Sequence, residues 1–345
     1  MVSKQKAHVA VVGATGAVGC EMIHCLEALG FPVGQIDLVA SCRSSGKKVE
    51  TPWGACIVQD AENYDFAGVD IALFSAGKKV SLALAPKAVK AGALVIDNTS
   101  AFRFDADKAL VVPEVNGALI DLSARIIANP NCSTIQMVLA LSALDRAVGI
   151  EYVRVATYQS CSGAGQKGIN ALMEETREAM DGKRPQKSAV HARTIAFDVV
   201  PQIGAFEDDG FSEEEHKMMV ETKKILSRPD LRVSATCVRV PVARSHCEVV
   251  HVGMKRRISV QEACAILDAA PGLRVTDKND RLAYPTAVQG EGKFETLVGR
   301  VRIDPVDQGL IFWIVSDNLL KGAALNAVQI ACAAWNHGRI DSNEG

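Results

Sequence analysis

A glycine-rich segment near the start of the chain limits the possible folds more than any other feature of the sequence. The apolar run His8–Val12 is typical of a buried strand, and Gly13–Gly19 (GATGAVG) follows it directly. Ala17–Leu29 then carries apolar residues at helical spacing. Because glycines permit a tight turn between two elements, the sequence predicts a strand, a turn and a helix in immediate succession.

Short apolar runs alternate with helical patterns over the first third of the chain. We predict further strands at Ile36–Ala40, Val69–Phe74, Ala93–Asp97, Leu110–Val112 and Ile126–Ala128, and a helix at Val80–Ala91. Strands that are apolar on both faces and separated by helices form a parallel sheet that is covered on both sides. The sequence therefore predicts a doubly wound α/β domain of the Rossmann type.

The pattern changes after about residue 150, where longer strand-like runs follow one another. We predict strands at Tyr152–Gln159, Arg232–Val242, Glu248–Met254, Val298–Ile303 and Gly309–Val315. We predict helices at Gly168–Met180, Ser212–Leu226, Ser259–Ala269 and Leu319–His337, and polar loops at Gly204–Gly210 and Gln289–Lys293. Successive strands of this kind are typical of a mixed sheet, so the second domain is predicted to be α+β.

Composition excludes several classes of protein. A chain of 345 residues with 48% hydrophobic content can form two domains with sizeable cores. The net charge of −2 favours neither nucleic acid nor an anionic membrane as a partner. The N-terminal apolar run resembles a signal peptide, but Gly13, Thr15 and Gly16 interrupt it too early. The ten cysteines include no C-x-x-C pair, so we expect reduced thiols, a cytoplasmic location and no metal site.

The glycine turn suits the pyrophosphate of a dinucleotide, because the backbone can approach it closely and the helix N-terminus offers N–H groups. The predicted cofactor-binding residues of this turn are Gly13, Ala14, Thr15, Gly16, Ala17 and Val18. Ser75 ends another strand on the same side of the predicted sheet, although packing alone would also explain a small residue there.

The segment after the second strand distinguishes between NAD and NADP. NAD sites place an acidic residue at the end of this strand, but Asp37 is near its start. Ser41, Arg43 and Ser44 follow the strand instead, and hydroxyl and guanidinium groups suit a 2′-phosphate. The sequence thus predicts NADP, and a solvated basic loop is the alternative.

Cys132 is the candidate nucleophile among the ten cysteines. It lies in NPNCST (129–134), between the predicted strand Ile126–Ala128 and a helical pattern over Ile135–Val148. A position at a helix N-terminus, which Ser133 or Thr134 would help to cap, lowers a thiol pKa and offers N–H groups to an oxyanion. Most cysteines are packing residues, and the strand–turn–helix setting is what favours catalysis here.

Other candidate site residues are a histidine and several charged groups. His246 lies between two strand-like runs and is the candidate proton acceptor. Arg103 follows the polar strand end DNTS (97–100), and Arg239 precedes His246 in its strand and suits a carboxylate. Glu221 and Lys224 are one turn apart on a predicted helix, and their spacing alone favours a surface ion pair of little energetic value.

The chain resembles the aspartate-semialdehyde dehydrogenases of bacteria over nearly its whole length. The matching segments are VAVVGATGAVG (9–19), DIALFSAG (70–77), VIDNTSAFR (95–103), VVPEVN (111–116), NPNCSTIQM (129–137), TYQSCSGAG (157–165), ETKKI (221–225), SATCVRVPV (234–242) and VSDNLLKGAA (315–324). The resemblance implies NADPH-dependent reduction of 4-aspartyl phosphate to L-aspartate 4-semialdehyde, with release of phosphate, in the biosynthesis of lysine, methionine and threonine.

The resemblance also implies a role for each matching residue. Cys132 would form a thioester, His246 would be the general acid/base, Gln159 would orient the substrate and Asn131 would border the oxyanion site. Arg239 and Glu221 would bind the carboxylate and the amino group, and Arg103 and Lys224 would hold phosphate near Asn98 and Ser100. Ser162, Gly163 and Asn318 would lie near the nicotinamide.

The domain boundaries and the assembly follow from the same resemblance. It implies an NADP-binding domain of residues 1–131 with 319–345, a catalytic and dimerisation domain of residues 132–318, and a homodimer. Two alternatives stay open: an N-acetyl-γ-glutamyl-phosphate reductase and a cofactor-binding relative without catalysis. Cys161 is an unexpected thiol beside Gln159, either a neutral substitution or a second target for alkylation.

Overall fold

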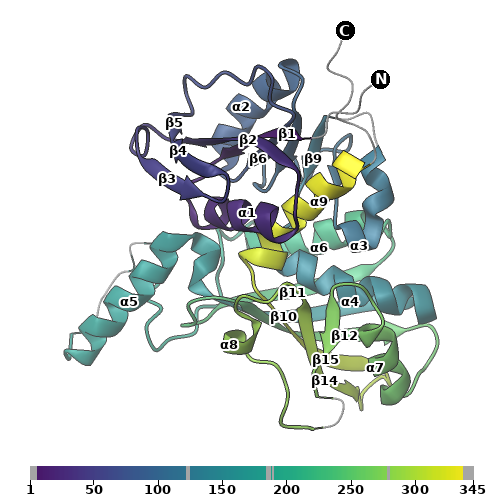
Figure 1. The fold of residues 1–345 in the computed structure, drawn as a ribbon. Helices are drawn as coiled ribbons and strands as arrows, with labels where there is room; N and C mark the ends of the chain where they lie inside the picture. Colours follow the sequence, from purple (N-terminus) through teal and green to yellow (C-terminus); the bar gives the residue numbers. More distant parts are fainter. Residues whose placement is uncertain (1–5, 122–124, 184–187, 189, 278–279, 337–345) are drawn as a thin grey trace. The chain divides into compact units, whose positions relative to one another are not determined.

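The chain forms two compact units in a computed structural model, residues 1–130 with 323–345 and residues 131–322 (Figure 1). The structure describes residues 6–121, 125–183, 188, 190–277 and 280–336. His337, the predicted end of the C-terminal helix, lies outside the described residues. Within these ranges, no helix combines the length and the apolar content that crossing a bilayer requires.

The first unit is built on a seven-stranded sheet in the order β5-β2-β1-β6-β7-β9-β8, and the described strand pairs in it are parallel. Its strands are β1 (Ala7–Val12), β2 (Val33–Ala40), β5 (Gln59–Asp60), β6 (Ile71–Phe74), β7 (Leu94–Asp97), β8 (Ala109–Leu110) and β9 (Ile126–Ala128). The four residues of β6 and the four of β7 are all buried, as expected for strands covered on both faces. The predicted doubly wound α/β domain is confirmed.

Helices from distant parts of the chain cover this sheet. They are α1 (Ala17–Ala28), α2 (Lys78–Lys90), α3 (Pro113–Asn116), the short 3-10 helix η1 (Gly117–Asp121) and the C-terminal α9 (Leu325–Asn336). α9 packs against α1 and α3 (Figure 1), and the rings of Phe31 and Trp335 meet edge to face with centroids 5.9 Å apart. The C-terminal helix therefore completes the core of the N-terminal unit.

The differences from the prediction in the first unit include β5, which was missed, a further hairpin and the end of β8. The hairpin of β3 (Lys48–Thr51) and β4 (Gly54–Ile57) was missed, because its residues are mostly exposed and form no apolar run. The predicted strand Leu110–Val112 was too long at its end, since the chain leaves β8 after Leu110. Val112 is already the N-cap of α3, and Pro113 occupies the first helical position, where its missing N–H costs nothing.

The second unit contains a six-stranded sheet in the order β11-β10-β12-β15-β14-β13, with both parallel and antiparallel pairs. Its strands are β10 (Ile150–Gln159), β11 (Arg232–Arg239), β12 (His246–Met254), β13 (Leu273–Val275), β14 (Thr296–Ile303) and β15 (Leu310–Ser316). The predicted mixed sheet of an α+β domain is thus confirmed.

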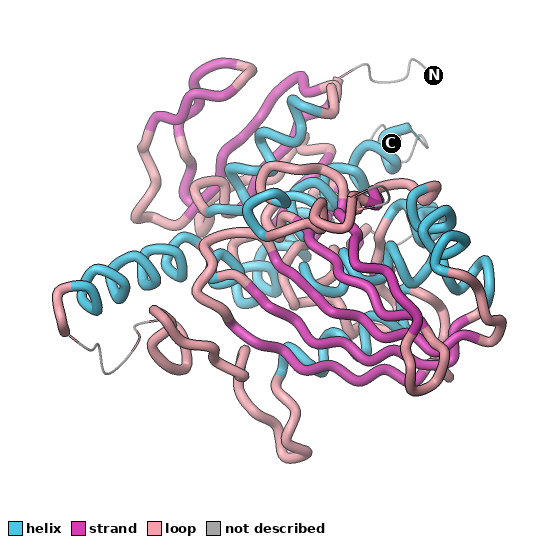
Figure 2. The backbone as a smooth tube through the Cα atoms, turned by 90° about the horizontal axis from the view of Figure 1, so that it is seen from below, coloured by secondary structure: helices cyan, strands magenta, loops and turns pink. Residues whose placement is uncertain are grey.

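The sheet of the second unit has one face covered by helices. α4 (Cys132–Val148), α6 (Glu213–Ile225) and α7 (Val260–Asp268) pack on it, whereas Figure 2 views the strands from the opposite side. In β10, Val155 and Thr157 point to the helices and are buried, while Arg154 and Tyr158 alternate with them and are exposed. Strand alternation therefore separates a core face from an open face.

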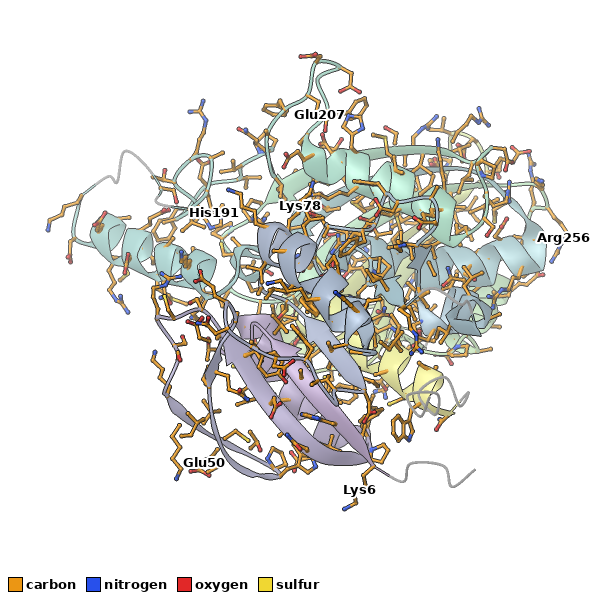
Figure 3. All side chains as sticks on the ribbon, turned by 90° about the horizontal axis from the view of Figure 1, so that it is seen from above. Lys6, Glu50, Lys78, His191, Glu207 and Arg256 are labelled. Atoms are coloured by element: carbon orange, nitrogen blue, oxygen red, sulfur yellow. The ribbon has the colours of Figure 1, made fainter. Side chains whose placement is uncertain are left out.

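The remaining elements of the second unit lie around the sheet. They are the 3-10 helix η2 (Cys161–Ala164), α5 (Gln166–Met180), α8 (Ala287–Gly290) and the start of the π-helix η3 (Leu320–Ala324), whose last two residues belong to the first unit. Figure 3 shows His191 beside α5, and Glu207 and Arg256 at the outer edges of this unit. Thr286 and Gln289 form a capping box that starts α8, so a helix occupies part of the loop predicted at Gln289–Lys293.

Two strand boundaries beside site residues of the second unit were predicted wrongly. β11 ends at Arg239 rather than Val242, because the N–H of Val242 donates to the carbonyl of Val240, 2.8 Å away, and turns the chain. The next strand, β12, begins at His246 itself, two residues earlier than predicted. These shifts place Arg239 at the last position of one strand and His246 at the first position of another.

Candidate active site

Cys132 is the first residue of α4, and Asn131 is its N-cap. The Asn131 side-chain oxygen accepts hydrogen bonds from the N–H groups of Ser133 and Thr134 at 2.9 and 3.3 Å. The helix therefore starts three residues before the predicted Ile135, and the predicted capping by Ser133 or Thr134 was wrong. An asparagine directly before the first helical residue reaches both of these amides, which a residue inside the first turn cannot do.

Two carboxylates of α6 hold Asn131 in place. The backbone N–H of Asn131 donates to Glu221 Oε2 at 2.6 Å, and its side-chain amide donates to Glu214 Oε1 at 2.8 Å. Residues 214 and 221 are two turns apart, so both point to the same side of α6. Glu221 is fully buried, and the surface ion pair that its spacing favoured is therefore wrong. Lys224, one turn further on, is half-buried.

Glu214 is a site residue that the sequence did not reveal. Its Oε1 also accepts from the Gln159 side-chain amide at 3.1 Å, so Gln159, at the end of β10, is tied to Asn131 through one carboxylate oxygen. Burial alone would raise the pKa of Glu214, but Lys217 and these two amides together hold it below the usual value. The Glu214 carboxylate therefore stays ionised. In the sequence, Glu214 lies in the run EEEH (213–216), and only its seven-residue spacing from Glu221 distinguishes it from the neighbouring glutamates.

His246 lies fully buried at the start of β12 rather than in an open loop. Its Nδ1 accepts a hydrogen bond from the backbone N–H of Ser160 at 3.0 Å. Burial lowers the pKa of His246 to about 3, and the positive charge of Arg239 contributes in the same direction. The structure thus presents His246 as a neutral imidazole.

Arg239 and Gly163 lie directly beside this histidine. Arg239, almost fully buried, donates from Nη1 to the carbonyl of Ser160 at 2.6 Å. A Cβ at position 163 would lie 2.7 Å from Arg239 Nη1 and 3.4 Å from His246 Nε2. Only glycine therefore allows the η2 segment to pass this close to both side chains.

Asn318 and Ser162 belong to the same cluster. Asn318 Oδ1 accepts from Ser162 Oγ at 2.9 Å and from the backbone N–H of Ser245 at 3.0 Å. Ser160 Oγ lies 2.9 Å from Ser162 Oγ, so this network reaches the residue that contacts His246. The predicted residues Ser162, Gly163 and Asn318 are thus brought together around Ser160, which sequence reasoning missed.

Gly322 is a third residue that the prediction missed. A Cβ at this position of η3 would lie 3.0 Å from the Cβ of Cys132, so glycine leaves room beside the candidate nucleophile. Among residues 6–121, 125–183, 188, 190–277 and 280–336, no cluster of three or more His, Cys, Asp or Glu side chains is arranged to hold a metal ion.

Two buried titratable side chains lie close to these residues in sequence. Burial raises the pKa of the Cys161 thiol to about 11, and this thiol is fully buried, so the alternative that it is a second target for alkylating reagents is wrong. Burial also raises the pKa of Glu248 well above its usual value, against a smaller opposite effect of the Gln136 amide that faces it. Both oxygens of Glu248 have no hydrogen-bond partner among the described residues. Glu248 is therefore held as a neutral acid two residues after His246.

The glycine turn of the first unit has the geometry that close backbone approach requires. Gly13 has φ +96°, and a Cβ there would lie 2.9 Å from Ser75 Oγ and from Ala76 N. A Cβ at Gly19 would lie 2.2 Å from the carbonyl oxygen of Gly13, so α1 can pack on the turn only with glycine at that position. Gly16 precedes α1 and has no side chain to occupy the first-turn N–H groups, which suits an anion.

The loop after β2 meets this turn. Thr15 Oγ1 donates to Ser44 Oγ at 3.2 Å. This contact joins a residue predicted to bind the pyrophosphate to one predicted to bind the 2′-phosphate. Ser41 and Arg43 are exposed in the same loop. This surface can hold the phosphate groups of a dinucleotide.

The remaining predicted site residues of the first unit follow β7. Arg103, almost fully buried, donates from Nη2 to the carbonyl of Asn98 at 2.9 Å. The Asn98 side-chain oxygen accepts from the Asn129 amide at 2.7 Å, and Ser100 is half-buried in the same segment. Arg103 and Lys224, both predicted to bind phosphate, belong to different units.

Comparison with known proteins identifies the family. Residues 8–123 match the NAD binding domain of semialdehyde dehydrogenase, and residues 141–321 match its dimerisation domain. The aspartate-semialdehyde dehydrogenase of Bacillus subtilis is 48% identical over 94% of this chain and 96% of its own length. The chain belongs to the aspartate-semialdehyde dehydrogenase family. The resemblance that the motifs indicated is therefore confirmed.

Other members of the aspartate-semialdehyde dehydrogenase family agree in sequence and in fold. The Legionella pneumophila enzyme is 47% identical over 94% of each chain. The solved structure of aspartate semialdehyde dehydrogenase II from Vibrio cholerae, complexed with ASA, matches with a TM-score of 0.92 and 46% identity, covering 96% of this chain and 98% of that one. The Candida albicans family member, solved with NADP, matches in fold with a TM-score of 0.74 at 24% identity, covering 97% of this chain and 99% of that one.

Proposed function

We propose that this protein is an NADPH-dependent aspartate-semialdehyde dehydrogenase, which reduces 4-aspartyl phosphate to L-aspartate 4-semialdehyde through a thioester on Cys132. The observation that carries the proposal is the placement of Cys132 at the capped N-terminus of α4. His246 and Arg239 lie in the same unit beside Gly163, and Gln159 is linked to the cap through Glu214. A nucleophile, amide donors and charged groups are the parts that acyl transfer requires.

Each polar group has a place in this chemistry. The Cys132 sulfur attacks the acyl carbon, and the positive end of the α4 dipole and the Gln159 amide stabilise charge on the carbonyl oxygen. Arg239 suits the substrate carboxylate and the buried Glu221 suits its ammonium group, which an N-acetyl substrate lacks. Arg103 of the first unit and Lys224 of the second are each proposed as phosphate ligands. When bound, NADPH supplies the hydride that reduces the thioester.

The preference for NADP is part of the proposal. Arg43 and Ser41 are exposed in the loop after β2, and Ser44 in the same loop contacts Thr15 of the glycine turn. An arginine can pair with a 2′-phosphate through two N–H groups, which a lysine cannot do. Since the ten cysteines form no disulfide, we also propose a cytoplasmic location.

We further propose a homodimer formed through the open face of the six-stranded sheet. Tyr158 and Trp313 lie on this face with ring centroids 5.4 Å apart, and the match of residues 141–321 to a dimerisation domain supports its use as an interface. Exposed aromatic residues on a sheet face are typical of protein interfaces.

The activity is tested by phosphate-dependent NADP⁺ reduction with L-aspartate 4-semialdehyde. We expect Cys132→Ala to lower kcat/KM by about 10³-fold or more, because no other group can form the thioester. The matched control, Cys264→Ala in α7, should keep wild-type turnover. Full turnover of Cys132→Ala, or a wild type that uses only the N-acetyl-γ-glutamyl substrate, would contradict the proposal.

Cofactor choice is tested with Arg43→Ala. The KM for NADP⁺ should rise roughly tenfold or more, about 1.4 kcal/mol of lost binding, and the KM for NAD⁺ should not change. Lys47→Ala removes an exposed charge from the same loop and is the control. If the two variants weaken NADP⁺ binding equally, the loop contributes only a diffuse positive field and the specific role of Arg43 is wrong.

Assembly is tested by sedimentation equilibrium. Wild type should have twice the mass of one chain, and Tyr158→Glu should shift it toward a single chain, since it places a charge in the proposed interface. Val306→Glu, at another exposed apolar position between β14 and β15, should remain dimeric. A monomeric wild type, or equal dissociation of both variants, would rule out this interface.

A further inference from the structure

A buried threonine lies one step inside the strand that ends at Gln159. Thr157 and Gln159 are two residues apart in β10, so their side chains point to the same face of the sheet, the one that the helices cover. Thr157 is fully buried and Gln159 almost so. The Thr157 hydroxyl donates to Gln159 Oε1 at 3.1 Å. This hydrogen bond joins a side chain of the core to a residue of the site.

The direction of the hydrogen bond follows from a second contact of Thr157. The backbone N–H of Val238, in β11, donates to Thr157 Oγ1 at 3.3 Å. A backbone N–H can only donate, so the hydroxyl oxygen accepts there and its own proton is available for another acceptor. Gln159 Oε1 lies within reach of that proton.

The cross-strand neighbours of Thr157 compete little for this proton. Glu248 pairs with Thr157 from β12, but neither of its carboxyl oxygens has a hydrogen-bond partner among the described residues. Cys237 pairs with Thr157 from β11 and donates its thiol proton to Met218 Sδ at 3.5 Å. A neutral thiol is only a weak acceptor. The hydroxyl proton is therefore directed along β10, toward Gln159.

The other end of the Gln159 carboxamide is fixed by a charge. Gln159 Nε2 donates to Glu214 Oε1 at 3.1 Å. Glu214 is ionised, and a carboxylate can only accept, so the amide nitrogen rather than the amide oxygen must face it. A flipped amide would set its oxygen against the carboxylate and its N–H groups against the Thr157 hydroxyl proton. Thr157 and Glu214 thus favour the same orientation of Gln159.

This orientation leaves one donor of Gln159 for a ligand. A carboxamide nitrogen carries two N–H groups, and Gln159 Nε2 gives one of them to Glu214. Within the described residues, Glu214 is the one acceptor that Nε2 reaches. The second N–H group therefore remains for the substrate, at the end of β10.

We propose that Thr157 is a positioning residue, whose hydroxyl locks the Gln159 carboxamide in the orientation that presents an N–H group to the substrate carbonyl oxygen. This inference rests on the proposed function and deepens the role of Gln159 in it. Thr157 acts only through Gln159, from inside the core of the second unit. Since Gln159 stabilises charge that develops on the carbonyl oxygen, the hydroxyl of Thr157 affects kcat more than KM.

The first test replaces the Thr157 hydroxyl with a methyl group of similar size. Thr157→Val should lower kcat about tenfold and leave the KM for L-aspartate 4-semialdehyde nearly unchanged, because a freely rotating amide stabilises the transition state less. Thr157→Ser keeps a hydroxyl and should restore most of the activity.

The matched control is Thr296→Val in β14. Thr296 is fully buried in the same sheet, and its hydroxyl donates to Ser316 Oγ at 3.2 Å. This variant loses a buried hydroxyl far along the sheet order from β10 and should keep the wild-type kcat. Equal kcat values for Thr157→Val and Thr296→Val, or no rescue by Thr157→Ser, would argue against the proposal.

A double-mutant cycle separates positioning from a general effect on folding. If Thr157 acts through Gln159, Thr157→Val should change kcat by less than about twofold once Gln159 is replaced by alanine, because the two substitutions remove the same interaction. A purely structural role would lower kcat by the same factor, about tenfold, in both backgrounds. That second result would overturn the proposal.

The hold on the amide is measured directly in the substrate-free protein. The side-chain N–H groups of Gln159 are followed by NMR in ¹⁵N-labelled protein and assigned by their loss in Gln159→Ala. In wild type and Thr157→Ser they should exchange slowly with solvent, since they are buried and hydrogen-bonded. In Thr157→Val exchange should be at least about tenfold faster, and in Thr296→Val it should match wild type.

Unchanged exchange in Thr157→Val would show that the hydroxyl does not hold the amide, and the proposal would be wrong. The exchange rates are measured without substrate and do not depend on turnover. An inactive wild type would therefore defeat the proposed function, while the exchange rates would still decide whether Thr157 holds Gln159.

Discussion

The position of the candidate nucleophile depends on one asparagine held between two buried carboxylates. Asn131 caps α4 with its side-chain oxygen, while its two donors bond to Glu214 and Glu221 of α6. An N-cap contributes about 1 kcal/mol, whereas a hydrogen bond to a charged group contributes roughly 1.5–3 kcal/mol. The hydrogen bonds to the carboxylates of α6 thus stabilise the start of α4 by more than the cap itself does. The first residue of that helix is Cys132.

The same physical cause acts in opposite directions on two side chains of β12. Burial lowers the pKa of His246, because it disfavours a cation, and raises the pKa of Glu248, because it disfavours an anion. Both groups are consequently neutral. Glu214, by contrast, keeps its charge through Lys217 and two amide donors. The site therefore combines a fixed negative charge near the helix start with a neutral imidazole at His246.

Features encoded over short stretches were predictable from the sequence. Alternation of apolar runs and helical patterns predicted both sheets, and the glycine turn predicted the conformation at Gly13, where φ is +96°. Cys132 stood out because a strand precedes it and a helix follows. In each of these cases, residues that are close together in the sequence are sufficient for the prediction.

Features that depend on tertiary contacts were not predictable. Ser160 looks like a strand-end serine until the fold places its N–H against His246, which is 86 residues away in sequence. Glu248 interrupts a buried strand with a carboxyl group, which no alternation pattern predicts. The β3–β4 hairpin lacks an apolar face, so its sequence shows no alternation of apolar and polar residues that would predict the two strands. Long-range pairing, rather than local propensity, determines each of these features.

Trapping the acyl group shows whether Cys132 carries it during turnover. Wild type is mixed with L-aspartate 4-semialdehyde and NADP⁺ without phosphate, quenched in acid and analysed by peptide mass spectrometry. We expect an aspartyl thioester on the peptide that contains Cys132, and we expect it to disappear when phosphate is added before the quench. An adduct on another cysteine, such as Cys42, or NADP⁺ reduction with no adduct on any peptide, would contradict it.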